Sequence, residues 1–174
     1  MIRVKSFKQF VIPVSALVIF FVFGMPATAQ AGCNHSGQSV KNISKKNARS
    51  AITCLFNKGR SAPNVKRNGD LEKAAQGHSA VMARKRCVSH QCPGEGDLKQ
   101  RVARTGYLNG ASGYELGEVI IYGPSGASPR QMVDKWMNSS SHRSTITKSS
   151  FKHVGVGLSM DGGMVFATAD FGHR

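Results

Sequence analysis

The hydrophobic period of this chain changes along its length, and that change limits the fold more than any other feature. Over residues 44–58 the apolar side chains fall at the i, i+3, i+4, i+7 spacing of one buried helix face. Over 152–159 they alternate with glycine and polar residues, and Asp161-Gly162-Gly163 then turns the chain into a second apolar run at 164–171. Strands without βαβ crossovers favour an antiparallel sheet with helices packed on it, so the sequence predicts an α+β fold.

Helix caps and chain breakers predict the remaining elements. Helices are expected to begin after Ser44, Asp70, Asp97 and Ser128, because each residue can accept a hydrogen bond from the first turn. A buried strand is expected at 118–122, between glycines. The loops are expected at 61–69, 93–96 and 107–113, and a serine run at 139–141 is expected to end the last helix.

The N-terminus has the three parts of a secretory signal peptide. Three cations precede an apolar run at 10–24, and two Ala-x-Ala sites follow, with cleavage after Ala29 or after Ala31 fitting equally well. The run has about 15 residues, fewer than the ~20 that a membrane-spanning helix needs. We therefore expect residues 1–29 to be a signal peptide, 30–43 a polar N-terminal tail and 44–174 the folded domain of a secreted or cell-envelope protein. No transmembrane segment is expected after cleavage.

The charge of the chain is strongly positive. Removal of residues 1–29 takes three cations and no acids from a formal net charge of +15, which leaves +12 on the mature chain. An exported cation of this kind is expected to adsorb to anionic cell-envelope polymers or anionic lipid, unless the charge only solubilises the surface. Specific nucleic-acid recognition is not expected, because aromatic residues make up 7% of the chain and no nucleic-acid-binding motif occurs.

Four cysteines in an exported chain predict two disulfides. Cys87 and Cys92 are close enough in sequence to pair locally, which leaves Cys33 to join Cys54. The alternative is a zinc site that uses Cys87, Cys92 and the intervening His90, although no second ligand pair follows it. If the local disulfide forms, its loop is expected to hold His90 in place.

The residues that could carry chemistry are a few histidines and one glutamate. Common hydrolase and nucleotide-binding motifs do not occur, and neither does a Ser or Cys nucleophile beside a base. His90 and His142 follow predicted helices, and Glu118 begins the predicted strand, which suits proton transfer or metal binding if the fold brings them together. His78 lies on a buried helical stripe and is expected to be a hydrogen-bonded core or cleft-edge residue.

Several segments, in order, resemble the CAP superfamily (cysteine-rich secretory proteins, antigen 5 and plant pathogenesis-related 1) in its short bacterial SCP-like form. Residues 71–82 are similar to the family's Leu-x-x-Ala-Ala-x-x-His-Ser-x-x-Met helix, and 136–143 to Trp-Met-x-Ser-Pro-x-His-Arg. The remaining segments that carry the resemblance are 54–60, 89–90, 101–107, 117–118 and 151–157. Together they cover most of the mature chain.

The resemblance implies a three-layer α-β-α sandwich with a central antiparallel sheet, and a cleft lined by histidines and carboxylates. Carried over by motif, the cleft residues are His90, Glu118 and His142, with His78 nearby, and the two cleft histidines are the residues that would hold a divalent metal such as zinc. The chain departs from the family pattern at three positions: Val119 replaces Asn, Ser140 replaces Pro, and Ser139 stands where plant and animal members have a second Glu. These departures weaken the zinc prediction most.

Three functions follow from these observations. The preferred one is a secreted, non-enzymatic binding module whose His/Glu cleft takes a lipid, glycan, protein or metal ligand. The first alternative is a secreted metal-dependent or His/Glu acid-base hydrolase, with Glu118 activating water. The second is a cationic binder of anionic cell-envelope polymers, which salt would weaken far more than it weakens a cleft ligand.

Overall fold

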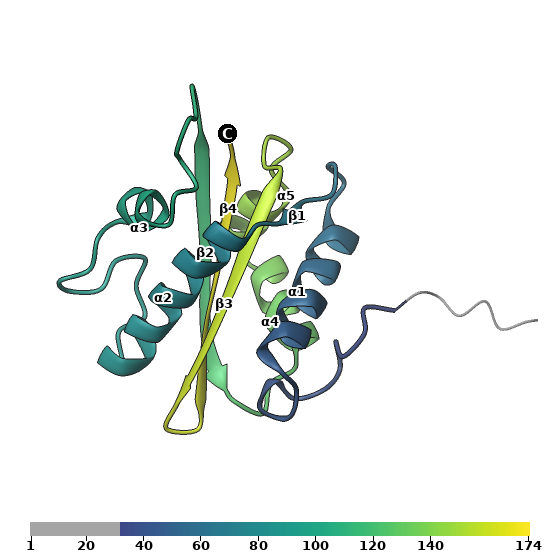
Figure 1. The fold of residues 1–174 in the computed structure, drawn as a ribbon. Coiled ribbons are helices and arrows are strands. Elements are labelled where there is room, and N and C mark those ends of the chain that lie inside the picture. Colours follow the sequence, from purple (N-terminus) through teal and green to yellow (C-terminus); the bar gives the residue numbers. More distant parts are fainter. Residues whose placement is uncertain (1–31) are drawn as a thin grey trace, which may run out of the picture. The chain divides into compact units, whose positions relative to one another are not determined.

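A four-stranded sheet in the order β1-β3-β4-β2 forms the centre of the domain (Figure 1). The strands are β1 (Lys66–Arg67), β2 (Glu115–Pro124), β3 (His153–Asp161) and β4 (Met164–His173). This computed structural model describes residues 32–174, so the predicted signal peptide lies outside the described residues. No helix among the described residues is long and apolar enough to cross a membrane.

The predicted hairpin is confirmed, and the predicted antiparallel sheet needs one correction. β3 and β4 pair antiparallel around the turn at Gly162 and Gly163, and β2 pairs antiparallel with β4. The short β1, which lies in the segment predicted as a loop, adds to the edge of β3 in parallel. The sheet is therefore mixed, because the β1–β3 pair is parallel and the other two strand pairs are antiparallel.

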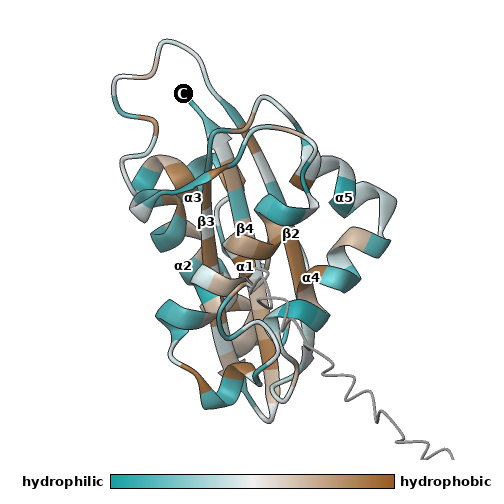
Figure 2. Cartoon of the chain, turned by 90° about the vertical axis from the view of Figure 1, so that its right-hand side faces the viewer, coloured by the Kyte–Doolittle hydropathy of each residue, from teal (hydrophilic) through white to brown (hydrophobic). Residues whose placement is uncertain are grey.

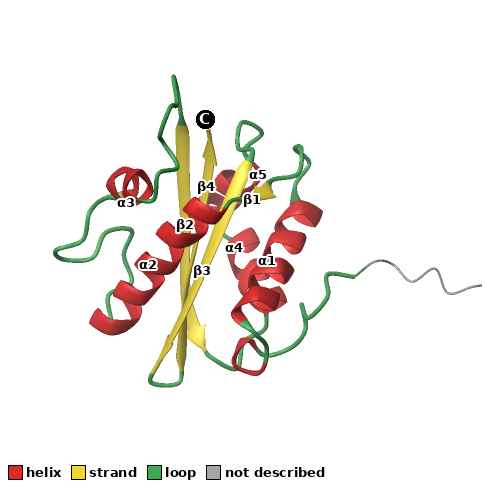
Figure 3. Ribbon diagram, in the orientation of Figure 1, coloured by secondary structure: helices red, strands yellow, loops and turns green. Residues whose placement is uncertain are grey.

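Helices cover both faces of the sheet, as the three-layer prediction requires (Figure 3). One layer contains α2 (Gly69–Lys85), which packs on β3 and β4, and α3 (Leu98–Arg104) beside it. The other contains α1 (Lys45–Gly59), α4 (Pro129–Asn138) and α5 (Ser140–Thr147). The sequence did not predict α5, which begins at the serine run that ends α4.

Three of the four predicted helix caps are confirmed. The side chains of Ser44, Asp97 and Ser128 accept backbone hydrogen bonds from the first turns of α1, α3 and α4. The prediction of Asp70 as the cap of α2 was wrong. Asn68 caps this helix and accepts from the amides of Asp70 and Leu71, so the helix begins earlier than predicted.

The main hydrophobic core lies between the sheet and the α1, α4 and α5 layer. Phe56 of α1 contacts Trp136 of α4 and Phe171 of β4, with ring centroids 5.5 and 5.4 Å apart. The indole of Trp136 donates to the carbonyl of Ile120 at 3.0 Å, which fixes α4 against β2. Figure 2 shows the hydrophobic stretches of the strands between the helices.

Two glycines let α2 lie directly on the sheet. On β3, Val154, Val156 and Leu158 enter the main core, so Gly155 and Gly157 face α2. A Cβ on Gly155 would lie 2.1 Å from backbone atoms of α2, and one on Gly157 would lie 2.3 Å from them. These distances are shorter than any van der Waals contact, so only glycine permits this approach.

Both predicted disulfides are present, Cys33–Cys54 and Cys87–Cys92. The segment predicted as a polar tail contacts the core: the amide of Val40 donates to the carbonyl of Ala127 at 2.9 Å, and the Val40 side chain is buried. From residue 32 onward the chain therefore belongs to the same unit as the predicted domain.

Candidate binding cleft

The candidate site lies on the sheet face that α2 covers. Glu118 of β2, Asp170 of β4 and Gly155 of β3 are aligned across three strands. Side chains aligned in this way point to the same face of the sheet. Because Gly155 has no side chain, α2 closes over the two carboxyl groups, and the side chain of Glu118 is only 3% exposed.

Three basic groups surround the Glu118 carboxylate. His90 Nδ1 lies 2.7 Å from Oε1, and Arg101 Nη2 of α3 forms an ion pair with Oε2. His78 Nε2 of α2 lies 3.9 Å from Oε2. The fold thus brings three of the four predicted cleft residues together and adds an arginine to them.

This environment shifts the pKa values of the two buried carboxyl groups, Glu118 and Asp170, in opposite directions. Burial would raise the pKa of Glu118, but the hydrogen bond with His90 and the charge of Arg101 outweigh it and hold the pKa below its ordinary value. The pKa of Asp170 is raised well above its ordinary value, first by burial and then by the charge and hydrogen bond of Glu118. These shifts favour the ionised form of Glu118 and the neutral form of Asp170, which can donate to Glu118.

His78 is the buried histidine that its helical position predicts. Its ring is 0% exposed, and Nδ1 lies 2.8 Å from Oε2 of Glu95, in the loop before α3. The same carboxylate oxygen accepts from the backbone amide of Cys92 at 3.4 Å. His78 therefore joins the Cys87–Cys92 loop to the cluster around Glu118.

His90 is the cluster residue most open to solvent, with a side chain that is 60% exposed. Arg101 Nη1 donates to its backbone carbonyl at 2.9 Å, while the ring contacts Glu118. The hydrogen bond with Glu118 raises the pKa of His90 above its ordinary value. The structure thus holds His90 by Glu118 and Arg101, and its stabilisation by the disulfide loop stays a prediction.

His142 stands apart from the hydrogen-bonded cluster. It lies on α5, half-buried, and among the described residues it has no hydrogen bond or ion pair. Its pKa is lowered, first by burial and then by the charge of His90, so the two rings are near enough to interact electrostatically. His142 therefore lies near His90 without belonging to the cluster.

The donor set does not match a protein-bound zinc site. Within residues 32–174 no group of three or more His, Cys, Asp or Glu side chains is arranged to hold a metal ion. Zinc sites need at least three protein ligands, and both oxygens of Glu118 already bind His90 and Arg101. The alternative cysteine site is excluded, because Cys87 and Cys92 are joined in a disulfide. Zinc held by His90 and His142 stays a prediction, and we derive no chemistry from it.

Sequence reasoning missed three residues of the cluster: Glu95, Arg101 and Asp170. Glu95 lies between two glycines in a segment interpreted only as a chain breaker, and Arg101 was interpreted only as part of a helix. Asp170 offered a signal, because a carboxyl group in the middle of an apolar strand must find a partner or lose its charge. Its partner depends on the β2–β4 register, which the sequence does not give.

These features define a class: a disulfide-closed α-β-α sandwich with a buried His/Glu cluster under its second helix. Residues 46–171 match the model of the cysteine-rich secretory protein family, CAP, and the chain belongs to this family. It is 34% identical over 87 residues to the uncharacterized protein YkwD of Bacillus subtilis, half of this chain but only 32% of that protein.

Solved structures show the same fold. An outer surface protein of Borrelia burgdorferi is 17% identical with a TM-score of 0.64, over 76% of this chain and 96% of that one. An extracellular protein with an SCP domain from Bacillus anthracis is 24% identical with a TM-score of 0.60, over 76% of this chain and 44% of that one. At these identities the likeness concerns the fold alone.

Proposed function

We propose that the chain is a secreted binding domain that recognises its ligand at the cleft of His90, Glu118 and His142 without turning it over. The observation that carries this proposal is the pairing of Glu118 with both His90 and Arg101. A general base works best with a pKa near the working pH and within hydrogen-bond reach of the proton that it takes. Glu118 suits this role poorly, because its pKa is held below its ordinary value and its side chain is only 3% exposed.

Secretion is supported by two observations. Both disulfides need an oxidising compartment to form and persist. The two similar structures above are described as those of an outer surface protein and an extracellular protein. We therefore propose that the domain works outside the cytoplasm.

Calorimetry with the purified, oxidised chain tests the cleft. The probes are soluble peptidoglycan fragments for a glycan ligand, phosphatidylglycerol vesicles for a lipid and zinc chloride for a metal. We expect one probe to bind saturably and to lose about tenfold in affinity, the worth of one charged hydrogen bond, in His90→Ala or His142→Ala. His35→Ala is the matched control, because His35 is an exposed histidine outside the cleft.

Two results would contradict the proposal. Binding that both cleft variants leave unchanged would remove the cleft as the recognition site. Release of soluble fragments from peptidoglycan, abolished by Glu118→Gln, would show a hydrolase and replace the binding function.

A further inference from the structure

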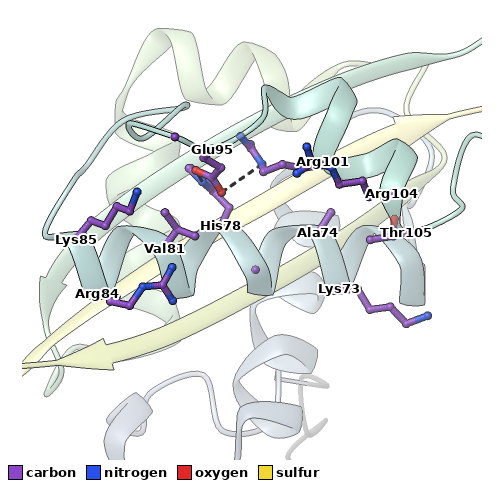
Figure 4. Close-up of a pocket in the computed structure, with 12 residues that line it drawn as sticks. Lys73, Ala74, His78, Val81, Arg84, Lys85, Glu95, Arg101, Arg104 and Thr105 are labelled. Carbon is purple, nitrogen blue, oxygen red and sulfur yellow. Dashed lines mark hydrogen bonds and ion pairs between the residues drawn. The ribbon is translucent and has the colours of Figure 1, made fainter.

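A second concave site lies between α2, α3 and the loop that joins them (Figure 4). Its volume is about 330 Å³, and it shares His78, Glu95 and Arg101 with the cluster. His90, Glu118 and His142 do not line it. We call this site the α2–α3 groove, and it is separate from the cleft of the proposed function.

Cations dominate the lining of the α2–α3 groove. It contains five basic side chains against the single carboxylate of Glu95, and that carboxylate already binds His78 at 2.8 Å. The five are Lys73, Arg84, Lys85, Arg101 and Arg104. A concave site lined by one sign of charge concentrates ligands of the opposite sign.

Two of these cations, Arg84 and Arg104, have no partner within the described part of the chain. The nine acidic residues of the chain all follow residue 69, and within residues 32–174 neither Arg84 nor Arg104 forms an ion pair or a hydrogen bond. The charge of Arg101 is already paired, since its guanidinium binds Glu118 and its buried Nε lies 4.0 Å from Oε1 of Glu95. Arg84 and Arg104 are therefore the cations of the groove that are open to an anionic ligand.

The groove runs along α2. Arg84 and Lys85 lie at one end, Lys73 and Arg104 at the other, and Ala74 and Val81 line the middle (Figure 4). Lys73 and Lys85 are twelve residues apart on α2, about 18 Å at 1.5 Å per residue. A volume of about 330 Å³ over this length leaves room for one unbranched chain.

We propose that the α2–α3 groove binds a linear anionic chain that carries phosphoryl groups. Its cations come from both walls, Arg84 and Lys85 from α2 and Arg104 from α3, so they approach one anionic chain from different directions. A tetrahedral phosphoryl group can accept from several directions at once, whereas a planar carboxylate matches one guanidinium fork.

Binding of a linear inorganic polyphosphate, measured by fluorescence anisotropy over a range of salt concentrations, tests this site. In Arg84→Gln/Arg104→Gln we expect an affinity loss of about tenfold or more. The dependence of log K on log salt should also become shallower by about two. Both side chains are exposed, so the double variant is expected to fold. Lys45→Gln/Lys46→Gln removes the same charge from α1, on the opposite face of the sheet, and should leave the affinity close to that of wild type.

Each of the following binding results would overturn the proposal. Equal losses in both double variants would show attraction by the net charge alone, and no loss in the arginine variant would place binding elsewhere. Equally tight, arginine-dependent binding of polyglutamate would refute the preference for phosphoryl groups. Arginine-dependent binding of phosphatidylglycerol vesicles without binding of polyphosphate would refute a free chain as the ligand. His142→Ala should leave polyphosphate binding unchanged, because His142 does not line the groove, so failure of this site and failure of the cleft are distinguishable.

Discussion

Replacement of Asp170 by Asn removes one titrating proton from the cluster and leaves its geometry in place. Asp170 is 0% exposed, and among the described residues no N–H or hydroxyl group donates a hydrogen bond to its carboxyl oxygens. As a neutral acid it can donate to Glu118, its neighbour across β2 and β4. An Asn amide can donate the same hydrogen bond, so the variant is expected to fold normally.

The effect on stability follows from the direction of the pKa shift. Below the ordinary Asp pKa of about 3.8, Asp170 holds its proton in both the folded and the unfolded chain. Above it, the unfolded chain releases the proton and the folded chain keeps it, so the free energy of unfolding falls by about 1.4 kcal/mol per pH unit. The decline ends when the pH passes the raised pKa of the folded state.

Glu118 contributes with the opposite sign at lower pH. Its pKa is depressed in the folded state, so its contribution is present above the ordinary value of about 4.5 and is lost as the pH falls through the folded pKa. Above pH ~5 the contribution of Glu118 therefore no longer changes with pH. The shifted pKa values of His90 and His142 act in wild type and in the Asp170 variant alike, so the difference between the two proteins reports Asp170.

Urea unfolding of wild type and Asp170→Asn from about pH 5 upward, followed by circular dichroism, measures the difference. We expect the stability of wild type relative to the variant to fall by about 1.4 kcal/mol per pH unit at the start of this range. Asp134→Asn, at an exposed position on α4, should run parallel to wild type. Parallel curves for Asp170→Asn would show that Asp170 is ionised in the folded chain and would refute the assignment of a neutral acid.

Three further predictions concern the same region. Gly155→Ala should destabilise the chain by about 1–3 kcal/mol or more in urea unfolding, since the new Cβ would lie 2.1 Å from the α2 backbone. Arg101→Met should cost about 3–5 kcal/mol in the same assay, because it removes the buried guanidinium that pairs with Glu118 Oε2. Reduction of Cys87–Cys92 should shift the NMR titration of the His90 imidazole, and an unchanged titration would show that the disulfide does not hold this ring.

The elements that the sequence predicted well are those with a local signal. The helical stripe of α1 and the capping residues of α3 and α4 depend on neighbours within one or two turns, and all were found where expected. β1 has only two residues and is defined by its pairing with His153 and Val154, far along the chain. No local pattern could reveal it.

The same distinction between local and long-range signals applies to the residues of the candidate cleft. His78, His90 and Glu118 were found because each lies in a recognisable segment, and the structure brings them together. Asp170 and Arg101 join them only through the strand register and the position of α3, which depend on the whole fold. The sequence therefore indicated which residues could form the cleft. It did not indicate which groups balance the charge of Glu118.

The electrostatics of the cleft depend on the glycines of β3. With a side chain at residue 155, α2 could not lie on the sheet at its present distance, and water could reach the carboxyl groups beneath it. Solvated carboxyl groups would titrate near their ordinary values, so both Asp170 and Glu118 would ionise and repel each other. Burial instead leaves one neutral acid and one carboxylate, whose single charge matches the Arg101 guanidinium. Gly155 therefore permits the burial that raises the pKa of Asp170 and favours a single charge in the cluster.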